Sequence, residues 1–411
     1  MEQFGKHIRS EGEIDRSAAA PPRHFEPFKK TYPYVAFAMF INNMYPNPAT
    51  EKRRIIAIPL TWLVISPCYI IICIDIYHCW QVNDIDKVFA HTIIIGPFTA
   101  TFLKMALIFY KRREARRILD EINQDHSVCN NLTSEYQTIL GKWIKFMQFY
   151  EKFWNACSFI GSFCFHFMAI GMMIYSALFT EKFTKYMVHD INLPFGEPEK
   201  RLEFPYFEFF FIQTTLIGCI YYANFTGYDG FLVLSIIHSC SKIELCAQAL
   251  VDAVKVEDDR LRIKQLGYVI MEQNRLYRYV ELVTDTFQGW LSTIATCMVV
   301  HLCTCAYHLS KNSFDVHFMA ATGSSCFYVF TLCASAGIMK ETAAKLSSDL
   351  YCCGWEHVTD VRVRKMVQFM IARAQIPLKI MAMGLYDFDV ELFTRMMKMA
   401  YTMFTLLQQT N

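Results

Sequence analysis

Seven segments of the chain carry about twenty mostly apolar residues each, the length that an α-helix needs to cross the hydrocarbon core of a bilayer. They lie at roughly 55–77, 88–110, 155–179, 206–237, 285–309, 316–338 and 388–410. No alternation with a period of two residues indicates a membrane β-barrel, and in lipid only helices and closed barrels satisfy every backbone group. The sequence therefore predicts an all-α, polytopic membrane protein with seven transmembrane helices.

The positions of lysine and arginine predict the orientation of these spans. Of the 40 such residues, 31 lie in the N-terminal region to residue 54 and in the segments after the second, fourth and sixth spans, whereas 6 lie in the other three loops. Loops rich in these residues stay in the cytosol. We therefore expect a cytosolic N-terminus and an extracellular C-terminus, the reverse of a G-protein-coupled receptor. The glycosylation sequon at Asn131 would then face the cytosol and stay unmodified, and a second one at Asn224 would be buried in the fourth span.

Composition and motifs exclude several other classes of protein. Charged residues are only 19% of the chain and the net charge is +2, so nothing favours nucleic acid as a partner. No nucleophile elbow, phosphate loop or zinc-helix motif indicates an enzyme. Most of the 16 cysteines lie in apolar runs, and the adjacent Cys352 and Cys353 lack a second pair at zinc spacing. We expect no cofactor, no disulfide framework and no metal site.

Amphipathic segments follow the second, fourth and sixth spans. Residues 111–154, 239–284 and 339–386 repeat apolar residues near helical spacing, so the spans should continue as long helices into the cytosol, with the charged run KVEDDRLRIK as a break. Pro377 should end or kink a helix near Gln375. The run YVAFAMFINNM is too short to span and fits a short interfacial helix. We divide the chain into four parts: a cytosolic N-terminal region 1–54, a six-span bundle 55–338 with cytosolic helical extensions, cytosolic helices 339–387, and a seventh span 388–411.

The C-terminal seventy residues carry a specific order of side chains. In sequence these are Tyr351, Trp355, the basic segment Arg362 to Lys365, Arg373, Pro377, Leu378, Ala382, Phe393, Lys398, Tyr401, Leu406, Leu407 and Gln408. This order resembles the C-terminal signature of insect odorant receptors. The layout of the spans and the LPFGEP stretch at 193–198 agree with it more weakly, and the segment WEHVTDVRVRKMVQFMIARAQ looks moth-like.

The resemblance implies an odorant-gated, non-selective cation channel in which four subunits surround one pore. In that family an odorant-tuned subunit assembles with a common co-receptor through cytosolic helices, here with Tyr351, Trp355, Arg373 and Pro377 as the expected anchor residues. The co-receptor has a long insertion between its fourth and fifth spans, where this chain has only about 45 residues. The chain therefore resembles a tuning subunit, expected in the plasma membrane of olfactory neuron dendrites. A metabotropic receptor or a transporter is the alternative.

Polar residues of the closing span share one helical stripe. Arg395, Lys398, Thr402, Thr405 and Gln409 are spaced by 3, 4, 3 and 4 residues. A charge at the bilayer centre costs about 2.5–3.5 kcal/mol, so lipid is a poor environment for this stripe. The stripe either lines a water-filled pore, or Arg395 and Lys398 snorkel to the cytosolic boundary. Family comparison places the gate in the last two turns, at Leu406, Gln409 and Thr410, but two cations are awkward in a cation pore.

A volatile ligand requires a cavity of apolar and aromatic side chains with a few polar groups. Such residues gather in the outer half of the second, third, fourth and sixth spans, where the resemblance also places the family's pocket. The candidates are Phe98, Phe165, Ile170, Met173, Tyr206, Phe209, Phe210, Gln213, Thr214, Ile217, Thr322, Ser325 and Tyr328. For any one of them, ordinary packing within the bundle is the alternative interpretation.

Four ionisable residues in or near the spans receive structural interpretations. Lys104 should form an ion pair or snorkel, and His91 and His166 should be hydrogen-bonded polar groups rather than metal ligands. Asp75, near the outer end of the first span, should be hydrated.

Overall fold

The computed structural model describes residues 24–189, 191–192, 198–311 and 316–409, and these residues are almost entirely helical. The principal helices are α2 Phe28–Thr31, α3 Pro33–Ile41, α4 Glu51–Gln81, α5 Ile85–Tyr110, α6 Arg112–Cys129, α7 Ser134–Phe179, α8 Tyr206–Asn224, α9 Gly230–Lys255, α10 Asp259–Lys311, α11 Val316–Tyr351, α12 Val361–Ala374 and α13 Val390–Gln409. A π-helical segment, η4 (Phe225–Asp229), joins α8 to α9, and short 3-10 turns lie at η2 Pro48–Thr50, η3 Pro198–Leu202 and η5 Trp355–His357.

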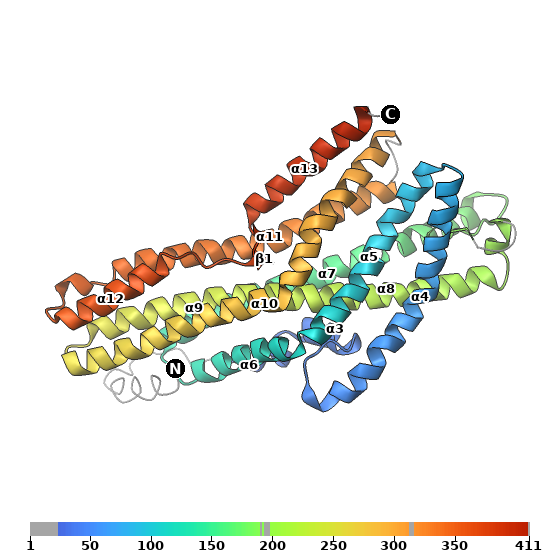
Figure 1. The fold of residues 1–411 in the computed structure, drawn as a ribbon. Helices are drawn as coiled ribbons and strands as arrows, with labels where there is room; N and C mark the ends of the chain where they lie inside the picture. The colour runs from blue at the N-terminus through green and yellow to red at the C-terminus, as the bar shows by residue number, and fades with distance from the viewer. Residues whose placement is uncertain (1–23, 190, 193–197, 312–315, 410–411) are drawn as a thin grey trace.

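The molecule is an elongated helical bundle. Toward one end lie α6, α12 and the junction of α9 with α10, and at the other end lie the turns from α4 to α5 and from α7 to α8 (Figure 1). Helix α7 has 46 residues and α10 has 53. At 1.5 Å per residue they are about 70 and 80 Å long, more than twice the roughly 30 Å hydrocarbon core, so both must extend beyond a membrane.

The predicted spans coincide with long helices. Six helical stretches among the described residues are long and apolar enough to cross a membrane, and they overlap the first six predicted spans almost completely. The seventh prediction corresponds to α13, whose 20 residues are about 30 Å long, although Glu391, Arg395 and Lys398 make this helix less apolar. The all-α prediction is confirmed; a two-residue antiparallel hairpin, β1 (Met381–Ala382) with β2 (Tyr386–Asp387), was not anticipated.

Helix continuations and breaks follow the sequence signals. Helix α9 ends at Lys255 and α10 begins at Asp259, so the break falls inside the predicted charged run. Helix α12 ends at Ala374, as predicted from Pro377, because the residue before a proline avoids the helical conformation. Gly384 has a φ of +72° in the turn of the hairpin before α13. Residues 34–41 are helical as predicted, within α3.

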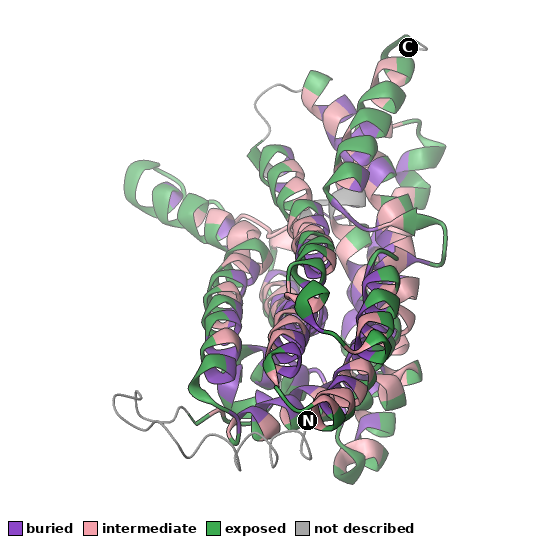
Figure 2. Cartoon of the chain, turned by 90° about the vertical axis from the view of Figure 1, so that its left-hand side faces the viewer, coloured by how far each residue is buried: buried purple, intermediate pink, exposed green. Residues whose placement is uncertain are grey.

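The core of the bundle is built around η4 and α9. Every residue from Thr226 to Ile243 is buried, because α7, α10 and α11 surround α9, whereas the outward faces of other helices are exposed (Figure 2). Helix α3 lies directly against η4: a Cβ atom on Gly227 would be 2.8 Å from the backbone nitrogen of Met39. Large apolar side chains such as Ile56 and Leu63 on α4 are 73% and 66% exposed, a surface suited to lipid.

Candidate functional site

Two of the predicted ligand residues lie together in an apolar cluster between α4, α5 and α8. Phe98 and Ile217 are 2% and 3% exposed and share this cluster with Ile65, Cys68 and Ile72. Phe98 contacts the ring of Tyr221 edge-to-face at 5.3 Å between centroids. Phe165 belongs instead to a separate cluster with Cys305, Phe318 and Ala321 on α10 and α11.

The remaining candidates on α7 and α8 lie on both sides of these helices. Phe210 and Gln213 are buried, whereas Ile170, Tyr206 and Phe209 are 39%, 40% and 60% exposed. Met173 and Thr214 are half-buried. The described part of this chain therefore does not gather all thirteen candidates around one cavity, and their role as a ligand site stays a prediction.

The three candidates on α11 make polar contacts. Ser325 Oγ lies 3.0 Å from His301 Nε2, and the hydroxyl of Thr322 donates to the carbonyl of Phe318. Tyr328 donates to Asp229 Oδ1 at 2.9 Å. This last contact connects α11 to a buried charged centre.

The centre is an ion pair in the middle of the bundle, between α5 and η4. Lys104 Nζ lies 2.5 Å from Asp229 Oδ2, and both side chains are fully buried. Asp229 Oδ1 also accepts from Trp290 Nε1 on α10 at 3.2 Å, in addition to Tyr328. Buried charges are tolerated where they are paired and hydrogen-bonded in this way.

Aromatic rings enclose the ammonium group of Lys104. Its Nζ lies 3.7 Å from the ring centroid of Phe225 and 4.6, 5.5 and 5.9 Å from those of Trp290, Tyr328 and Tyr228. Ring faces attract cations, and the attraction grows when water is excluded. The interpretation of Lys104 as an ion-paired residue is confirmed. Its partner Asp229 was missed, although an acidic residue inside the predicted fourth span was itself a signal of a functional or structural site.

The π-helical segment explains how Asp229 reaches this position. A π turn inserts an extra residue into the helix and leaves backbone carbonyls without their usual partners. Trp154 Nε1 on α7 donates to the carbonyl of Phe225 at 2.9 Å, which satisfies one of them. The segment thus turns Phe225, Tyr228 and Asp229 toward Lys104 while the chain stays helical.

Asp75 corrects one interpretation of the sequence. It is 3% exposed rather than hydrated, because the segment between α7 and α8 folds over it: Asn192 donates to both of its oxygens, and His91 Nε2 lies 3.2 Å away. His91 is therefore partnered, as expected. His166 is buried between the rings of Phe163 and Phe211, and neither of its ring nitrogens has a hydrogen-bond partner within the described part of the chain, which differs from the expectation.

The polar stripe of α13 lies away from the rest of the chain. Arg395, Lys398, Thr402 and Gln409 are exposed and Thr405 is half-buried, whereas Leu392, Met396 and Ala400 are buried on another face. Leu406 is 57% exposed. Thr410, the last predicted gate residue, and residues 193–197 of the LPFGEP stretch lie outside the described residues.

The predicted anchor residues lie around the ends of α11 and α12. Tyr351 is exposed, and its carbonyl accepts from Trp355 Nε1 at 3.1 Å. The guanidinium of Arg373 lies 4.0 Å from the ring centroid of Tyr277, whose hydroxyl donates to the Arg373 carbonyl. Pro377 is exposed just beyond α12. Arg373 therefore joins α12 to α10 within this chain, while Tyr351 and Pro377 remain accessible.

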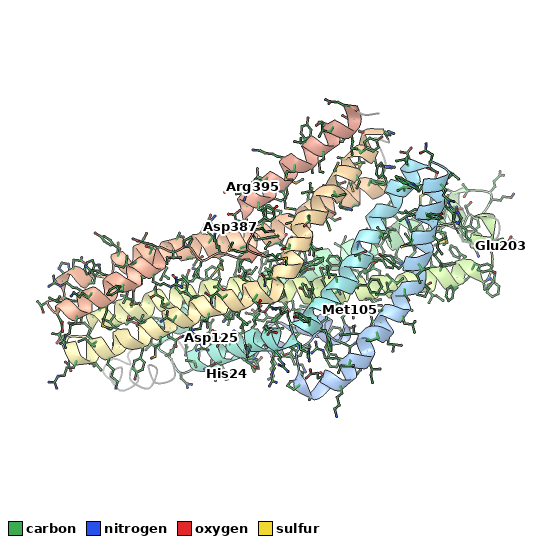
Figure 3. All side chains as sticks on the ribbon, in the orientation of Figure 1. His24, Met105, Asp125, Glu203, Asp387 and Arg395 are labelled. Carbon is green, nitrogen blue, oxygen red and sulfur yellow. The ribbon has the colours of Figure 1, made fainter. Side chains whose placement is uncertain are left out.

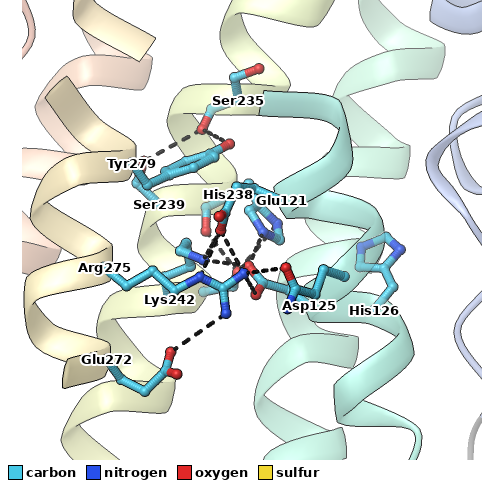
Figure 4. Close-up of polar contacts among 12 residues, drawn as sticks. Glu121, Asp125, His126, Ser235, His238, Ser239, Lys242, Glu272, Arg275 and Tyr279 are labelled. Carbon is cyan, nitrogen blue, oxygen red and sulfur yellow. Dashed lines mark hydrogen bonds and ion pairs between the residues drawn. The ribbon is translucent and has the colours of Figure 1, made fainter. Parts of the chain in front are cut away.

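A second charged network, also missed, ties α6, α9 and α10 together far from the predicted ligand residues. Figure 3 places Asp125 of this network and Glu203, three residues before the predicted ligand residue Tyr206, in opposite parts of the molecule. Asp125 Oδ2 lies 2.6 Å from Lys242 Nζ and 2.9 Å from His238 Nε2, and Arg275 bonds Glu121 at 2.7 Å (Figure 4). Burial alone would raise the pKa of Asp125, but Lys242, His238 and Arg275 hold it below its usual value. Burial and the nearby His238 lower the pKa of His126 to about 4.

Comparison with known proteins agrees with this architecture. A solved structure of the insect olfactory receptor OR5 from Machilis hrabei in complex with eugenol superposes with a TM-score of 0.71 at 15% identity, covering 100% of this chain and 97% of that one. A second structure of OR5 from Machilis hrabei gives the same TM-score and coverage at 17% identity. At these identities the likeness establishes the seven-span fold.

The sequence family provides the stronger link. The model of the family described as 7tm odorant receptor matches residues 84–401, which include η4, the Lys104–Asp229 centre and most of α13. The chain therefore belongs to the 7tm odorant receptor family.

Proposed function

We propose that this chain is the odorant-tuned subunit of a heteromeric, odorant-gated, non-selective cation channel that assembles with a common co-receptor. The observation that carries the proposal is the orientation of α13. Its apolar face is buried against its own bundle, while Arg395, Lys398, Thr402 and Gln409 are exposed. In a bilayer such a stripe requires water or a neighbouring subunit.

One helix cannot enclose a pore, so the stripe needs equivalent helices from other subunits. The gate would be formed by Leu406, Gln409 and Thr410, where an apolar constriction bordered by amide and hydroxyl groups opens by dilation and passes cations with little selectivity. Co-receptor subunits would dilute the positive charges of Arg395 and Lys398. Tyr351, Trp355, Arg373 and Pro377 would anchor the subunits, with Tyr351 and Pro377 exposed for contact.

The proposed ligand is a small, volatile, mostly apolar molecule held by the candidate residues of α5, α7, α8 and α11. Support comes from the apolar clusters around Phe98, Ile217 and Phe165, and from Tyr328, which couples α11 to the buried ion pair. Ligand binding would shift a closed-to-open equilibrium by its higher affinity for the open state. The four-part division of the chain, with an N-terminal region, a ligand bundle, anchor helices and a pore helix, follows from the same assignment.

The proposed topology has a cytosolic N-terminus and an extracellular C-terminus, in the plasma membrane of sensory dendrites. The end of the bundle that contains α12 would then be cytosolic, and the turn between α4 and α5 would be extracellular. Asn131 is exposed beside the α6–α7 turn, so it tests the sidedness directly. It should carry no glycan in cells, whereas a sequon introduced into the α4–α5 turn should be glycosylated; the opposite pattern contradicts the topology.

The decisive experiment is recording of odorant-evoked current from cells that express this chain with a co-receptor. We expect current that persists when G-protein signalling is blocked; responses that vanish under the block refute the channel assignment. Leu406→Ala and Gln409→Ala should alter ion permeability more than the rank order of odorants, and Phe210→Ala and Tyr328→Phe should do the reverse. Met403→Leu is the matched control, because Met403 lies one helical turn before Leu406 and off the polar stripe. This variant should change neither the ion permeability nor the rank order of odorants.

A further inference from the structure

A buried group of metal-ligating side chains lies near the α4–α5 turn. Asp75 and Cys79 are four residues apart on α4 and therefore share one face of the helix. His91 projects toward them from α5. A carboxylate oxygen, the sulfur and an imidazole nitrogen of these residues all lie within 4.8 Å of one another, and each side chain is at most 4% exposed.

Hydrogen bonds already orient two of these three groups. His91 Nδ1 lies 2.9 Å from His189 Nε2, so Nε2, 3.2 Å from Asp75 Oδ2, is the ring nitrogen that remains on the side of the carboxylate. Asn192 donates its backbone N–H to Asp75 Oδ2 at 2.8 Å and its amide to Oδ1 at 3.2 Å. Arg201 in turn donates to the Asn192 side chain at 3.1 Å. Metal ligands in proteins are typically fixed by an outer layer of this kind.

One distance in this group matches an edge of a tetrahedral coordination shell. With bonds of about 2.0 Å to nitrogen and oxygen and about 2.3 Å to sulfur, neighbouring ligands lie about 3.3 Å apart for nitrogen–oxygen and about 3.5 Å apart for oxygen–sulfur. His91 Nε2 is 3.2 Å from Asp75 Oδ2, close to the first of these values, whereas Cys79 Sγ is 3.7 Å from the other carboxylate oxygen, Oδ1. One ligand atom from each residue lies within 4.8 Å of the other two, so the side chains would have to close in on a bound ion.

A proton shared by His91 and Asp75 is the simpler occupant of this position. It accounts for that contact, with His189 as donor to His91 Nδ1, but it gives Cys79 only a long, weak contact with the carboxylate. A divalent cation uses all three groups. Once Cys79 has released its proton, one carboxylate and one thiolate also neutralise a 2+ charge, which a buried site requires.

The sequence alone favoured no metal site and treated His91 as a hydrogen-bonded group, but the convergence of these three side chains revises that expectation. We propose that Asp75, Cys79 and His91 form a binding site for a divalent transition metal, with Zn²⁺ as the best match and a fourth position open to water. Carboxylate, thiolate and imidazole are the ligands that Zn²⁺ takes in proteins, and three protein ligands with one open position is a common arrangement. The bound ion would fasten the α4–α5 hairpin to the segment after α7 through Asn192 and His189. This segment also contributes Ile191 to the apolar cluster that contains Phe98 and Ile217.

Binding is tested with Zn²⁺ alone on the full-length receptor purified with a co-receptor and stripped with a chelator. We expect one zinc ion per chain at this site, seen as a binding step that Cys79→Ser and His91→Gln weaken at least about 100-fold. Cys73→Ser on α4 and His78→Gln, an exposed neighbour of Cys79, are matched controls and should bind like the wild type. No such step in the wild type, or an equal loss in the control variants, overturns the site.

A measurement on the wild type avoids dependence on the folding of variants. Co²⁺ in place of Zn²⁺ should give the ultraviolet charge-transfer band of a thiolate–cobalt bond, together with visible bands of tetrahedral intensity. Bands of octahedral cobalt without sulfur overturn the proposal.

The consequence for signalling rests on the proposed function. Zn²⁺ applied from the extracellular side should shift the odorant concentration giving half-maximal current in the wild type and in the Cys73→Ser control, and not in Cys79→Ser. If the receptor binds zinc and gives the cobalt–thiolate bands but carries no odorant current, the channel assignment is contradicted and the metal site is supported. If the odorant-evoked current is normal but the receptor shows no zinc-binding step, the metal site is contradicted and the channel assignment is supported.

Discussion

Replacing Asp229 by asparagine should strongly destabilise the bundle, because it leaves the ammonium of Lys104 buried without a counter-charge. Both side chains are fully buried and 2.5 Å apart, so water cannot compensate. Asparagine retains an oxygen for Trp290 and Tyr328, and the change therefore isolates the charge from the hydrogen bonds. Removing one partner of a buried pair costs about 3–5 kcal/mol. The rings around Lys104 recover part of this at about 2 kcal/mol or less.

The double variant distinguishes a true pair from two separate effects. Lys104→Met removes the cation and keeps an apolar chain of similar length, so its combination with Asp229→Asn leaves no buried charge. We expect the cost of the double variant to fall short of the sum of the single costs by about 2–3 kcal/mol. The free energy of unfolding of the purified receptor, titrated from mild detergent into SDS, measures each variant.

A surface ion pair provides the control. Lys142 Nζ lies 3.0 Å from Glu244 Oε1, but these side chains are 65% and 31% exposed. Lys142→Met should therefore cost less than about 1 kcal/mol. The reasoning would be refuted if Asp229→Asn lowered the free energy of unfolding by less than about 1 kcal/mol. It would also be refuted if the losses caused by Asp229→Asn and Lys104→Met were strictly additive in the double variant.

Further predictions concern the packing of α3 and the pH dependence of stability that arises from His126 on α6. Gly227→Ala should lower the free energy of unfolding by about 1–3 kcal/mol and reduce surface expression, because its Cβ would be 2.8 Å from the backbone nitrogen of Met39. Gly267→Ala is the control: this position has open space around it, so the change should be neutral or slightly stabilising in the same assays. The pKa of His126 falls from about 6.5 in the unfolded chain to about 4 in the folded one, so the unfolded state binds more protons between these values. The contribution of His126 to stability should therefore decrease by about 3 kcal/mol as the pH drops from 6.5 to 4. The pH slope of His126→Asn should differ from that of the wild type by this amount, while His357→Gln, at an exposed site, should leave the slope unchanged. Equal slopes in wild type and His126→Asn would contradict the assignment.

Most of the fold follows from local properties of the sequence. Span length and apolarity locate the membrane helices because the bilayer leaves a backbone few options. Charged runs and Pro377 locate breaks because they act on neighbouring residues alone. The stripe on α13 follows from the helical period, since Arg395, Lys398 and Thr402 recur at 3 and 4 residues. These signals require no knowledge of which helices are neighbours.

Contacts between distant segments required the tertiary structure. Lys104 and Asp229 are 125 residues apart, and Asp75 and Asn192 are 117 apart. The sequence identified Lys104 as a residue that needs a partner, but it could not identify which of the acidic residues would be that partner. Nor could it predict the π turn at Phe225–Asp229, which depends on packing against α3 and on the bond from Trp154.

The candidate sites divide along the same line. The sequence determined that this chain is a seven-span helical protein with a polar final helix, because burial of apolar surface and backbone hydrogen bonding in lipid act locally. Only the tertiary structure determined that Asp75, Cys79 and His91 converge, that Lys104 is enclosed by aromatic rings, and that Phe209 and Tyr206 face outward. The physical reason is that helix rotation and pairing are set by many weak contacts between surfaces, which no single segment encodes.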